Sequence, residues 1–137
     1  MERIVSAETH VAIGHEADIV TARQKGRELA AEVGFKGSEL TIIATAISEM
    51  ARNIVVYAQR GEVVLSSVHD RGRRGVLIVA RDEGPGIANV DLAMQDGYST
   101  TKSLGLGLPG VRRLMDDFEI SSQDGHGTTV TMKNWVR

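Results

Sequence analysis

The stretch Val76-Leu77-Ile78-Val79-Ala80-Arg81-Asp82-Glu83-Gly84-Pro85-Gly86 decides the fold, because an unbroken apolar run ends in two acids and a glycine turn. The run predicts a central strand, residues 76–81, that is covered on both faces. Side chains alternate along a strand, so Asp82 is expected to face the same side as Ile78. The stretch therefore predicts a carboxylate delivered from the core to one edge of a sheet.

Other strands are predicted on both sides of this stretch. Residues 62–68 form the hairpin partner of residues 76–81, joined to them by the polar turn 70–75. Residues 4–13 alternate between apolar and polar, which predicts a strand with one covered face. Residues 119–122 and 128–136 are predicted as the last two strands, with a turn between them.

Two long helices are predicted between the first strand and the hairpin. The first begins at Asp18 as N-cap and stops at Gly34. The second begins at Ser38 as cap and runs to about Gln59, where Gly61 ends it. Its apolar positions fall in one stripe, which predicts a buried face made by Ile43, Ala44, Ile47, Ala51, Ile54 and Val55.

Glu49 and Asn53 lie roughly opposite that stripe, one helical turn apart. Their side chains are thus expected to point together at something other than the core. A carboxylate and an amide so placed can share a hydrated divalent cation, although such pairs also occur on many solvated helix faces.

The order of elements predicts an α/β fold, a two-layer sandwich with a mainly antiparallel sheet covered on one face by helices. Shorter helices are expected at residues 90–94 and 111–118. The 137 residues contain no repeat or linker, so residues 1–137 are expected to form a single domain.

Composition excludes several classes of function. The absence of cysteine removes disulfides, thiolate catalysis and cysteine-based zinc sites. A net charge of −2 gives no bulk attraction to nucleic acid or to an anionic membrane. No signal peptide and no run of about 18 apolar residues is evident, so a cytoplasmic protein is expected.

The glycine-rich stretch Gly105-Leu106-Gly107-Leu108-Pro109-Gly110 leads into a predicted helix and offers backbone amides to a phosphate. It also satisfies the dinucleotide pattern G-x-G-x-x-G. However, only 27 residues follow Gly110, too few for the rest of that fold. The P-loop pattern and the protein-kinase signatures are absent as well.

Taken in order, these segments resemble the GHKL ATP-binding superfamily over nearly the whole chain. Its N box resembles Glu49 to Asn53, and its G1 box resembles Asp82-x-Gly84-x-Gly86. Its G2 box resembles Gly105-x-Gly107, and a final box resembles Gly125-His126-Gly127-Thr128.

Within the superfamily the sequence is most similar to the switch serine/threonine kinases of the bacterial stressosome, and more loosely to anti-sigma-factor kinases. Three segments carry this likeness: Glu16-Ala17-Asp18-Ile19-Val20-x-Ala22-Arg23, Ile47-Ser48-Glu49-Met50-Ala51-Arg52-Asn53 and Gly107-Leu108-Pro109-Gly110-Val111-x-Arg113-Leu114-Met115. Lys102-Ser103 departs from the small residues expected in the lid.

The resemblance implies a role for each candidate site residue. Glu49 would be the catalytic base, Asn53 would ligate Mg²⁺ at the ATP phosphates, and Asp82 would bind the adenine amine. Residues 99–103 would form the ATP lid. The remaining residues would line the adenine pocket, approach the phosphates or support the base: Gly84, Gly86, Gly105, Gly107 and Thr128.

The function implied is a Mg-ATP-dependent protein serine/threonine kinase that phosphorylates STAS-domain antagonist or scaffold proteins in a stress-response partner switch. On release it would activate a PP2C-type phosphatase. An anti-sigma factor with kinase activity, which would hold a sigma factor, is the main alternative. A binding module that uses ATP only as a conformational ligand is another, and intact Glu49 argues against it.

Overall fold

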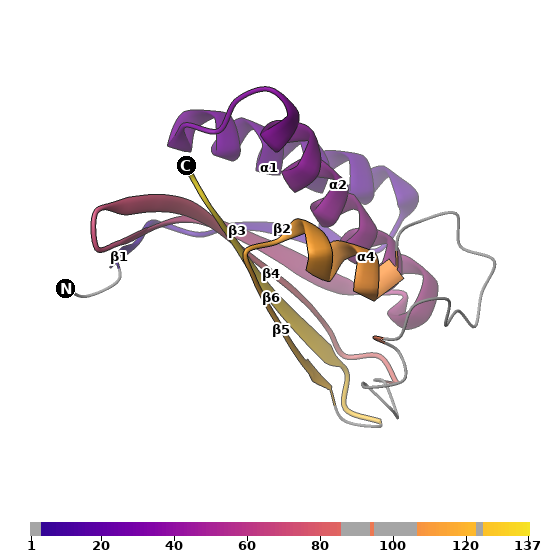
Figure 1. The fold of residues 1–137 in the computed structure, drawn as a ribbon. Coiled ribbons are helices and arrows are strands. Elements are labelled where there is room, and N and C mark those ends of the chain that lie inside the picture. Colours follow the sequence, from indigo (N-terminus) through magenta and orange to yellow (C-terminus); the bar gives the residue numbers. More distant parts are fainter. Residues whose placement is uncertain (1–3, 86–93, 95–106, 123–124) are drawn as a thin grey trace.

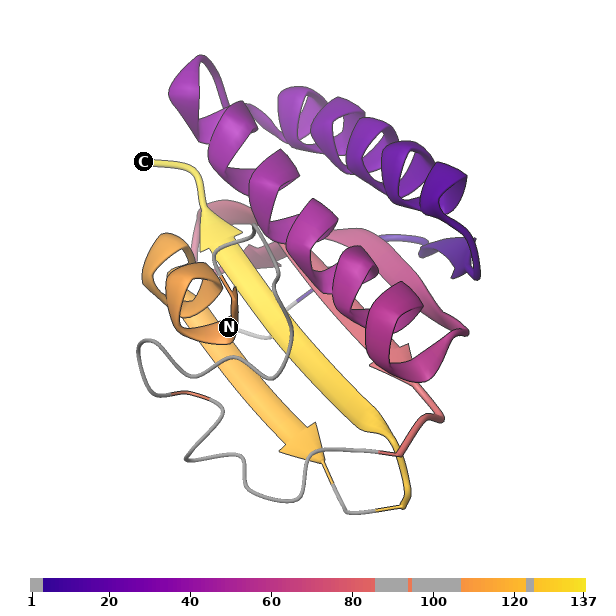
Figure 2. The same ribbon diagram turned by 90° about the vertical axis from the view of Figure 1, so that its right-hand side faces the viewer.

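The computed structural model describes residues 4–85, 94, 107–122 and 125–137. An antiparallel sheet of six strands forms one layer, in the order β1-β3-β4-β6-β5, and β2 also pairs with β3. Helices α1, α2 and α4 lie over one face of this sheet (Figures 1 and 2). The predicted two-layer α/β sandwich is thereby confirmed. The elements are β1 (Ile4–Val5), β2 (Thr9–Ile13), α1 (Glu16–Val33), α2 (Ser38–Asn53), a π-helical turn η1 (Ile54–Ala58), β3 (Gly61–Asp70), β4 (Arg73–Asp82), α4 (Gly107–Leu114), β5 (Asp117–Ser122) and β6 (Thr128–Trp135).

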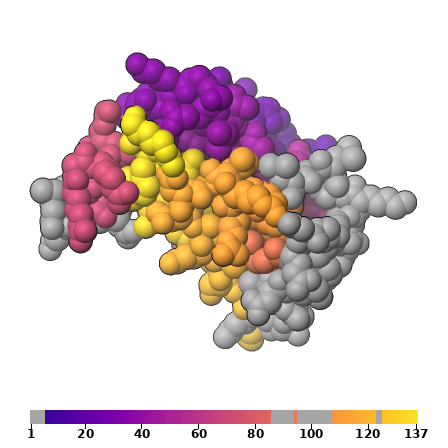
Figure 3. All heavy atoms as spheres, in the orientation of Figure 1, coloured from indigo at the N-terminus to yellow at the C-terminus, as the bar shows by residue number. Residues whose placement is uncertain are grey.

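The β3–β4 hairpin is longer than its sequence pattern predicts. The turn consists of Arg71 and Gly72 alone, with φ of 53° and 79°, rather than residues 70–75. Two residues with positive φ match the twist of the strands, which lets the ladder continue to the tip. The tip projects from the body of the molecule (Figures 1 and 3).

The N-terminal strand is split, although its alternation predicts a continuous one. Residues 6–8 separate β1 from β2. The Ser6 backbone N–H donates to the Ser67 carbonyl (3.0 Å), and its hydroxyl oxygen accepts from the Ser67 N–H (2.9 Å). A side chain thus replaces a carbonyl in the ladder, a local competition that periodicity does not reveal.

Each long helix begins close to its predicted start. Asp18 lies in the first turn of α1 rather than at its cap, and accepts from the backbone N–H groups of Gly14 (2.8 Å) and His15 (2.9 Å). Gly34, with φ of 126°, ends the helix as predicted. Ser38 is the first residue of α2, after the N-cap Gly37.

The later parts of the helical segments differ more from their predicted positions than the starts of the two long helices do. The second helix reaches Ala58, as predicted, but its last turn is the π-helical turn η1. Helix α4 spans Gly107–Leu114 instead of residues 111–118, and Phe118 lies in β5. The predicted helix 90–94 lies outside the described residues except for Met94.

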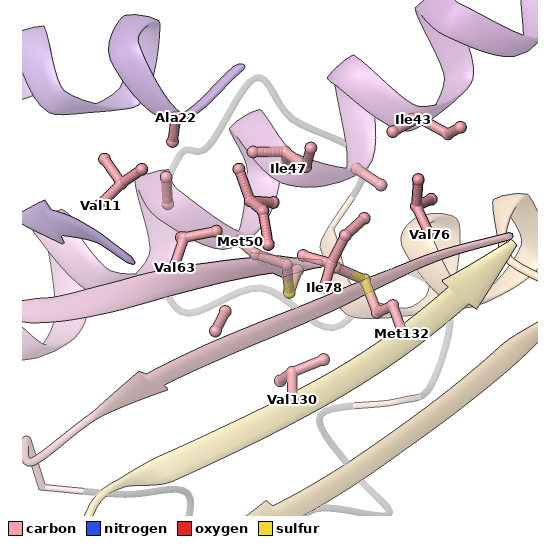
Figure 4. Packing of buried hydrophobic residues seen from close by; sticks show 14 of the residues in the cluster. Val11, Ala22, Ile43, Ile47, Met50, Val63, Val76, Ile78, Val130 and Met132 are labelled. Atoms are coloured by element: carbon pink, nitrogen blue, oxygen red, sulfur yellow. The ribbon is translucent and has the colours of Figure 1, made fainter. Parts of the chain in front are cut away.

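One hydrophobic core fills the space between the layers. Ile43, Ile47 and Met50 point from α2 toward β3, β4 and β6, where they face residues such as Ile78 and Met132 (Figure 4). Each side chain buried in this way stabilises the fold by roughly 1.5–3 kcal/mol. The apolar stripe predicted for α2 is therefore the buried face, with Val55 only partly buried.

Strand β4 is central but is fully covered on one face only. Ile78 and Ala80 are buried under the helices, whereas Leu77 and Val79 on the other face are half-buried. The prediction of cover on both faces was wrong, because the described helices all lie on one side of the sheet.

One segment meets the length and mean hydropathy of a membrane span, although it contains no unbroken apolar run. The segment is Ser38–Ala58, and half of its most apolar window is buried inside the domain. The core helix of a globular protein passes the same test, and α2 is the helix whose apolar face packs on the sheet.

Candidate nucleotide site

Three strand ends meet at one end of the sheet. Thr128, the first residue of β6, is the register partner of both Asp82 at the end of β4 and Ser122 at the end of β5. Figure 2 shows these ends side by side. The Thr128 and Ser122 hydroxyls lie 2.9 Å apart, and Ser122 donates to the Gly127 carbonyl (3.0 Å). The antiparallel register therefore brings together a carboxylate and two hydroxyls.

Asp82 is half-buried and keeps acceptor capacity. Its Oδ1 accepts from the Gly84 N–H at 2.9 Å, and the carboxylate makes no ion pair with any residue that the structure describes. An ionised carboxylate has about four lone-pair sites, so acceptor positions stay free. A carboxylate oriented in this way can accept a hydrogen bond from the exocyclic amine of a base.

Glycines allow the backbone to pack closely around Asp82. A Cβ at Gly84 would come 2.5 Å from the Ala58 Cβ, and one at Gly127 would overlap the Asp82 carbonyl. The Gly125 N–H donates to the Pro85 carbonyl, which joins the turn after β4 to the turn before β6. The hydrogen bond and the lack of side chains at the glycines thus keep the strand ends close together.

Helix α2 ends above the same region. Asn53 is its last residue and is half-buried, and the following Ile54 side chain packs under Gly61, the register partner of Asp82. The π-helical turn that follows places Ala58 against Gly84. Asn53 and Asp82 therefore belong to the same end of the molecule.

Glu49 lies one turn before Asn53 and is 7% exposed. Its Oε1 accepts from Arg52 Nη1 at 3.1 Å. The helical spacing puts Glu49 away from the apolar stripe of α2, and the contact with Arg52 was not predicted. The i, i+3 spacing of the two residues is the signal that could have indicated the pair.

Glu49 also lines a groove between α1 and α2, with a volume of about 370 Å³. The other lining side chains are polar or small, and three are arginines: Arg23, Gln24, Arg27, Thr41, Ala44, Thr45, Ser48 and Arg52. No motif in the sequence predicted this groove, since it exists only where two helices pack side by side.

The glycine-rich stretch is described only from its third residue. Gly107 opens α4 with φ of 68°, a conformation that favours glycine, and α4 packs against α2. Gly86, Gly105 and the predicted lid 99–103, which includes Lys102-Ser103, lie outside the described residues. Their predicted contacts with a nucleotide stay predictions.

The donor chemistry fits a magnesium ion that is shared with phosphates. Among the described residues no three His, Cys, Asp or Glu side chains cluster to cage a metal. Mg²⁺ usually keeps several waters and takes one or two protein oxygens together with phosphate oxygens. The amide oxygen of Asn53 meets that requirement, so this residue would hold the ion.

A helical layer on an antiparallel sheet, with a strand-end carboxylate below a helix that carries an acid and an amide, defines a nucleotide-binding domain of the ATPase type. Residues 15–134 match the family described as "Histidine kinase-like ATPase domain". The chain belongs to this family, and the predicted GHKL relationship is confirmed.

Proteins of similar sequence indicate more closely which kind of ATPase-type domain this is. The chain is 50% identical over 127 residues to "Serine/threonine-protein kinase RsbT" of Bacillus subtilis (strain 168), which covers 93% of this chain and 96% of that protein. It is 35% identical over 100 residues to "Anti-sigma F factor" of Clostridium kluyveri, covering 69% of this chain and 70% of that one. The protein is thus a homologue of the serine/threonine kinase RsbT with anti-sigma F relatives.

Solved structures share the fold. "The crystal structure of the RsbU and RsbW domains of Rv1364c from Mycobacterium tuberculosis" matches with a TM-score of 0.59 and 23% identity, covering 94% of this chain and 32% of that chain. "Mycobacterial sensor histidine kinase MprB" matches with a TM-score of 0.57 and 17% identity, covering 94% and 99%. This chain thus spans about a third of the first of these proteins.

Proposed function

We propose that the protein is a Mg-ATP-dependent protein serine/threonine kinase of a bacterial stress-response partner switch. Its substrates are STAS-domain antagonist or scaffold proteins, and after release from them it activates a PP2C-type phosphatase in the cytoplasm. The observation that carries the proposal is the nearly buried Glu49 one turn from Asn53, at the end of the molecule where Asp82 lies. The identity with RsbT over nearly the whole chain supports it.

Binding of the nucleotide is assigned to the strand ends and to α4. Asp82 accepts a hydrogen bond from the adenine amine, and the Thr128 hydroxyl supports the base from the neighbouring strand. Backbone amides at the start of α4 face the phosphates, where a helix N-terminus favours negative charge. Asn53 would hold Mg²⁺, which would supply charge neutralisation at the phosphates.

Phosphate transfer is assigned to Glu49. Its carboxylate accepts the proton of a substrate serine or threonine hydroxyl as the oxygen bonds to the γ-phosphorus and the bond to the β-phosphate oxygen breaks. In phosphoryl transfer the protein mainly positions reactants and offsets charge, so one base beside the metal ligand suffices. The Arg52 contact orients this carboxylate before the substrate arrives.

The proposal is tested by transfer of labelled γ-phosphate from Mg-ATP to a purified STAS-domain protein encoded beside this chain. We expect the native protein to transfer phosphate, Glu49→Gln to lose at least about 100-fold in rate, and chelation of Mg²⁺ by EDTA to stop transfer. Glu32→Gln, at an exposed position of α1, is the matched control and retains activity. A Glu49→Gln protein that transfers at the native rate would overturn the assignment.

An anti-sigma factor with kinase activity is the second candidate, favoured by the 35% identity with anti-sigma F factors. A pull-down with a sigma factor and a PP2C-type phosphatase separates the two. Retention of the phosphatase alone supports the switch kinase, whereas retention of the sigma factor supports the alternative. ATP binding without any transfer by a folded protein would leave a nucleotide-gated binding module.

A further inference from the structure

The π-helical turn η1 connects the end of α2 with the turn that follows β4. Its widened hydrogen bond runs from the Gln59 N–H to the Ile54 carbonyl, five residues back, at 2.7 Å. Ile54, at the start of η1, is buried in the core. Ala58, at its end, lies against Gly84. One end of η1 is therefore fixed by the core, and the other end touches the proposed nucleotide site.

The absence of a side chain at Gly84 is required by this contact and not by the backbone conformation. The φ of Gly84 lies outside the left-handed region, so an alanine could adopt the same backbone. A Cβ there would nevertheless come 2.5 Å from the Ala58 Cβ and 2.8 Å from the Ala58 Cα. Neither of these atoms can rotate away as the end of a long side chain could. Residue 84 is thus limited by the packing of Ala58 on the turn.

The position of Gly84 in turn sets the orientation of the Asp82 carboxylate. The backbone of Asp82 is fixed from both sides by its register partners, Gly61 and Thr128. Rotation of the side chain is the freedom that remains, and the Gly84 N–H donates to its Oδ1 at 2.9 Å. Hydrogen bonds weaken steeply as their geometry departs from linear. A displaced Gly84 would therefore turn the carboxylate away from its present direction.

We propose that Ala58 is a positioning residue for the nucleotide site: its methyl group supports Gly84, and the Gly84 N–H holds Asp82 in the direction of the adenine amine. The inference rests on the proposed function, which it deepens by naming a residue that determines the preference for adenine. Ala58 acts through Gly84 and needs no contact with the nucleotide.

Calorimetric titration with ATP and with ITP, each in the presence of Mg²⁺, tests this role. Ala58→Val adds two methyl groups beside Gly84 and should weaken ATP binding at least about tenfold, since a hydrogen bond to a charged group is lost. Binding of ITP, whose base has no amine at this position, should change less than about threefold. Ala58→Ser adds a single atom and should shift the ATP/ITP ratio in the same direction by a smaller factor.

Val56→Ala is the matched control, because Val56 lies in the same turn and its side chain is 51% exposed. This variant should bind both nucleotides within about twofold of the native protein. A native ATP/ITP ratio in Ala58→Val would overturn the proposal, even if both affinities fell. An equal change of the ratio in Val56→Ala would overturn it too, as would failure of the native protein to bind ATP.

A rescue experiment distinguishes packing against Ala58 from contact with the nucleotide. Gly84→Ala should weaken ATP binding at least about tenfold. Ala58→Gly/Gly84→Ala moves the methyl group to the other side of the contact, and should bind ATP at least about threefold more tightly than Gly84→Ala alone. Recovery stays partial because the Ala58 Cα lies 2.8 Å from the added Cβ. No recovery would show that the nucleotide itself limits residue 84, and would contradict the proposal.

The contact is also measured without nucleotide, by NMR of protein labelled with ¹⁵N-glycine. The Gly84 signal, assigned by its loss in Gly84→Ala, should move in Ala58→Val and stay in place in Val56→Ala. An unmoved signal in Ala58→Val would overturn the positioning role. These measurements need no phosphate transfer. A protein that shows the moved signal and the altered ATP/ITP ratio but transfers no phosphate therefore contradicts the kinase function and not this inference.

Discussion

In the proposed function, Asp82 is the strand-end side chain that would determine the choice of nucleotide. The β-register fixes it beside Thr128, and the Gly84 N–H occupies only one of its oxygens. In that function adenine would donate through its amine at this position, whereas hypoxanthine would present a carbonyl oxygen. A carboxylate accepts from the first and repels the second.

Asp82→Asn is therefore expected to weaken ATP binding by about 10–100-fold, because a hydrogen bond to a charged group contributes about 1.5–3 kcal/mol. The amide can donate to a carbonyl, so the preference of ATP over ITP should largely disappear. Calorimetric titration with both nucleotides measures this. Asp70→Asn, at the other end of the hairpin, is the control, and an unchanged ATP/ITP ratio in Asp82→Asn would contradict the role of the carboxylate.

Asp18 gives a prediction on pH. Hydrogen bonds from the backbone N–H groups of Gly14 and His15 lower the pKa of Asp18 below its usual 3.8. The stability that this carboxylate contributes is present above the unfolded-state pKa and is lost as the pH falls through the lower folded-state pKa. Thermal unfolding should show Asp18→Ala less stable than the native protein at pH 7, with the difference shrinking below about pH 4.

The matched variant is Glu28→Ala, an exposed acid on the same helix. Its Tm should stay close to that of the native protein at every pH. A Tm difference for Asp18→Ala that stays constant down to pH 2 would show that its charge does not contribute.

At the scale of the elements, the packing of α1 on α2 depends on Gly26. A Cβ at this position would overlap Cδ1 of Ile47, which is fully buried. The smallest residue on α1 thus lets the two helices approach, and this approach also shapes the groove beside Glu49.

Gly26→Ala is expected to destabilise the protein by about 1–3 kcal/mol from overpacking, partly offset by the better helix propensity of alanine. Ile47→Val removes the overlapping methyl group and costs about 0.5–1.5 kcal/mol alone. Urea unfolding of both variants and of the double variant measures the coupling. The free energy of unfolding of the double variant should be higher than the sum of the two single losses predicts. Simple additivity would show that the Cβ added at Gly26 does not clash with the Ile47 side chain.

How well the position of each element can be predicted from the sequence depends on the interactions that determine it. The apolar stripe of α2 and the position of Asp82 at the end of β4 are set by periodicity, and both were predicted correctly. The start of α4 at Gly107 and the two-residue hairpin turn depend on how neighbouring segments pack. The Ser122–Thr128 contact could not be predicted without the strand register, and the groove at Glu49 could not be predicted without the packing of two helices.

At the scale of the whole molecule, segments distant in sequence share one sheet and one core. Strand β6 lies between β4 and β5, and its Trp135 is held on several sides. The Trp135 N–H donates to Asp116 (2.8 Å), its Nε1 donates to Asp117 (3.1 Å), and the Arg73 guanidinium lies 4.1 Å from the ring. Asp116 is in turn paired with Arg137. The single tryptophan therefore reports on the last strand and on the hairpin together.

Because β6 and the helices contribute to the same hydrophobic cluster, the chain is expected to unfold as a single domain. Urea unfolding followed by Trp135 fluorescence, which senses the sheet, should coincide with unfolding followed by far-UV circular dichroism, which senses mainly the helices. The dependence of the free energy of unfolding on urea should be about 1–3 kcal/mol per molar.

ATP with Mg²⁺ at about 100 times its Kd should raise the free energy of unfolding by about 2.7 kcal/mol and shift both curves equally. At the same ligand concentration Asp82→Asn should show a much smaller shift, since this variant is expected to bind ATP more weakly. Two separated transitions, or a shift in only one of the two signals, would mean that the helices and the sheet unfold as separate units.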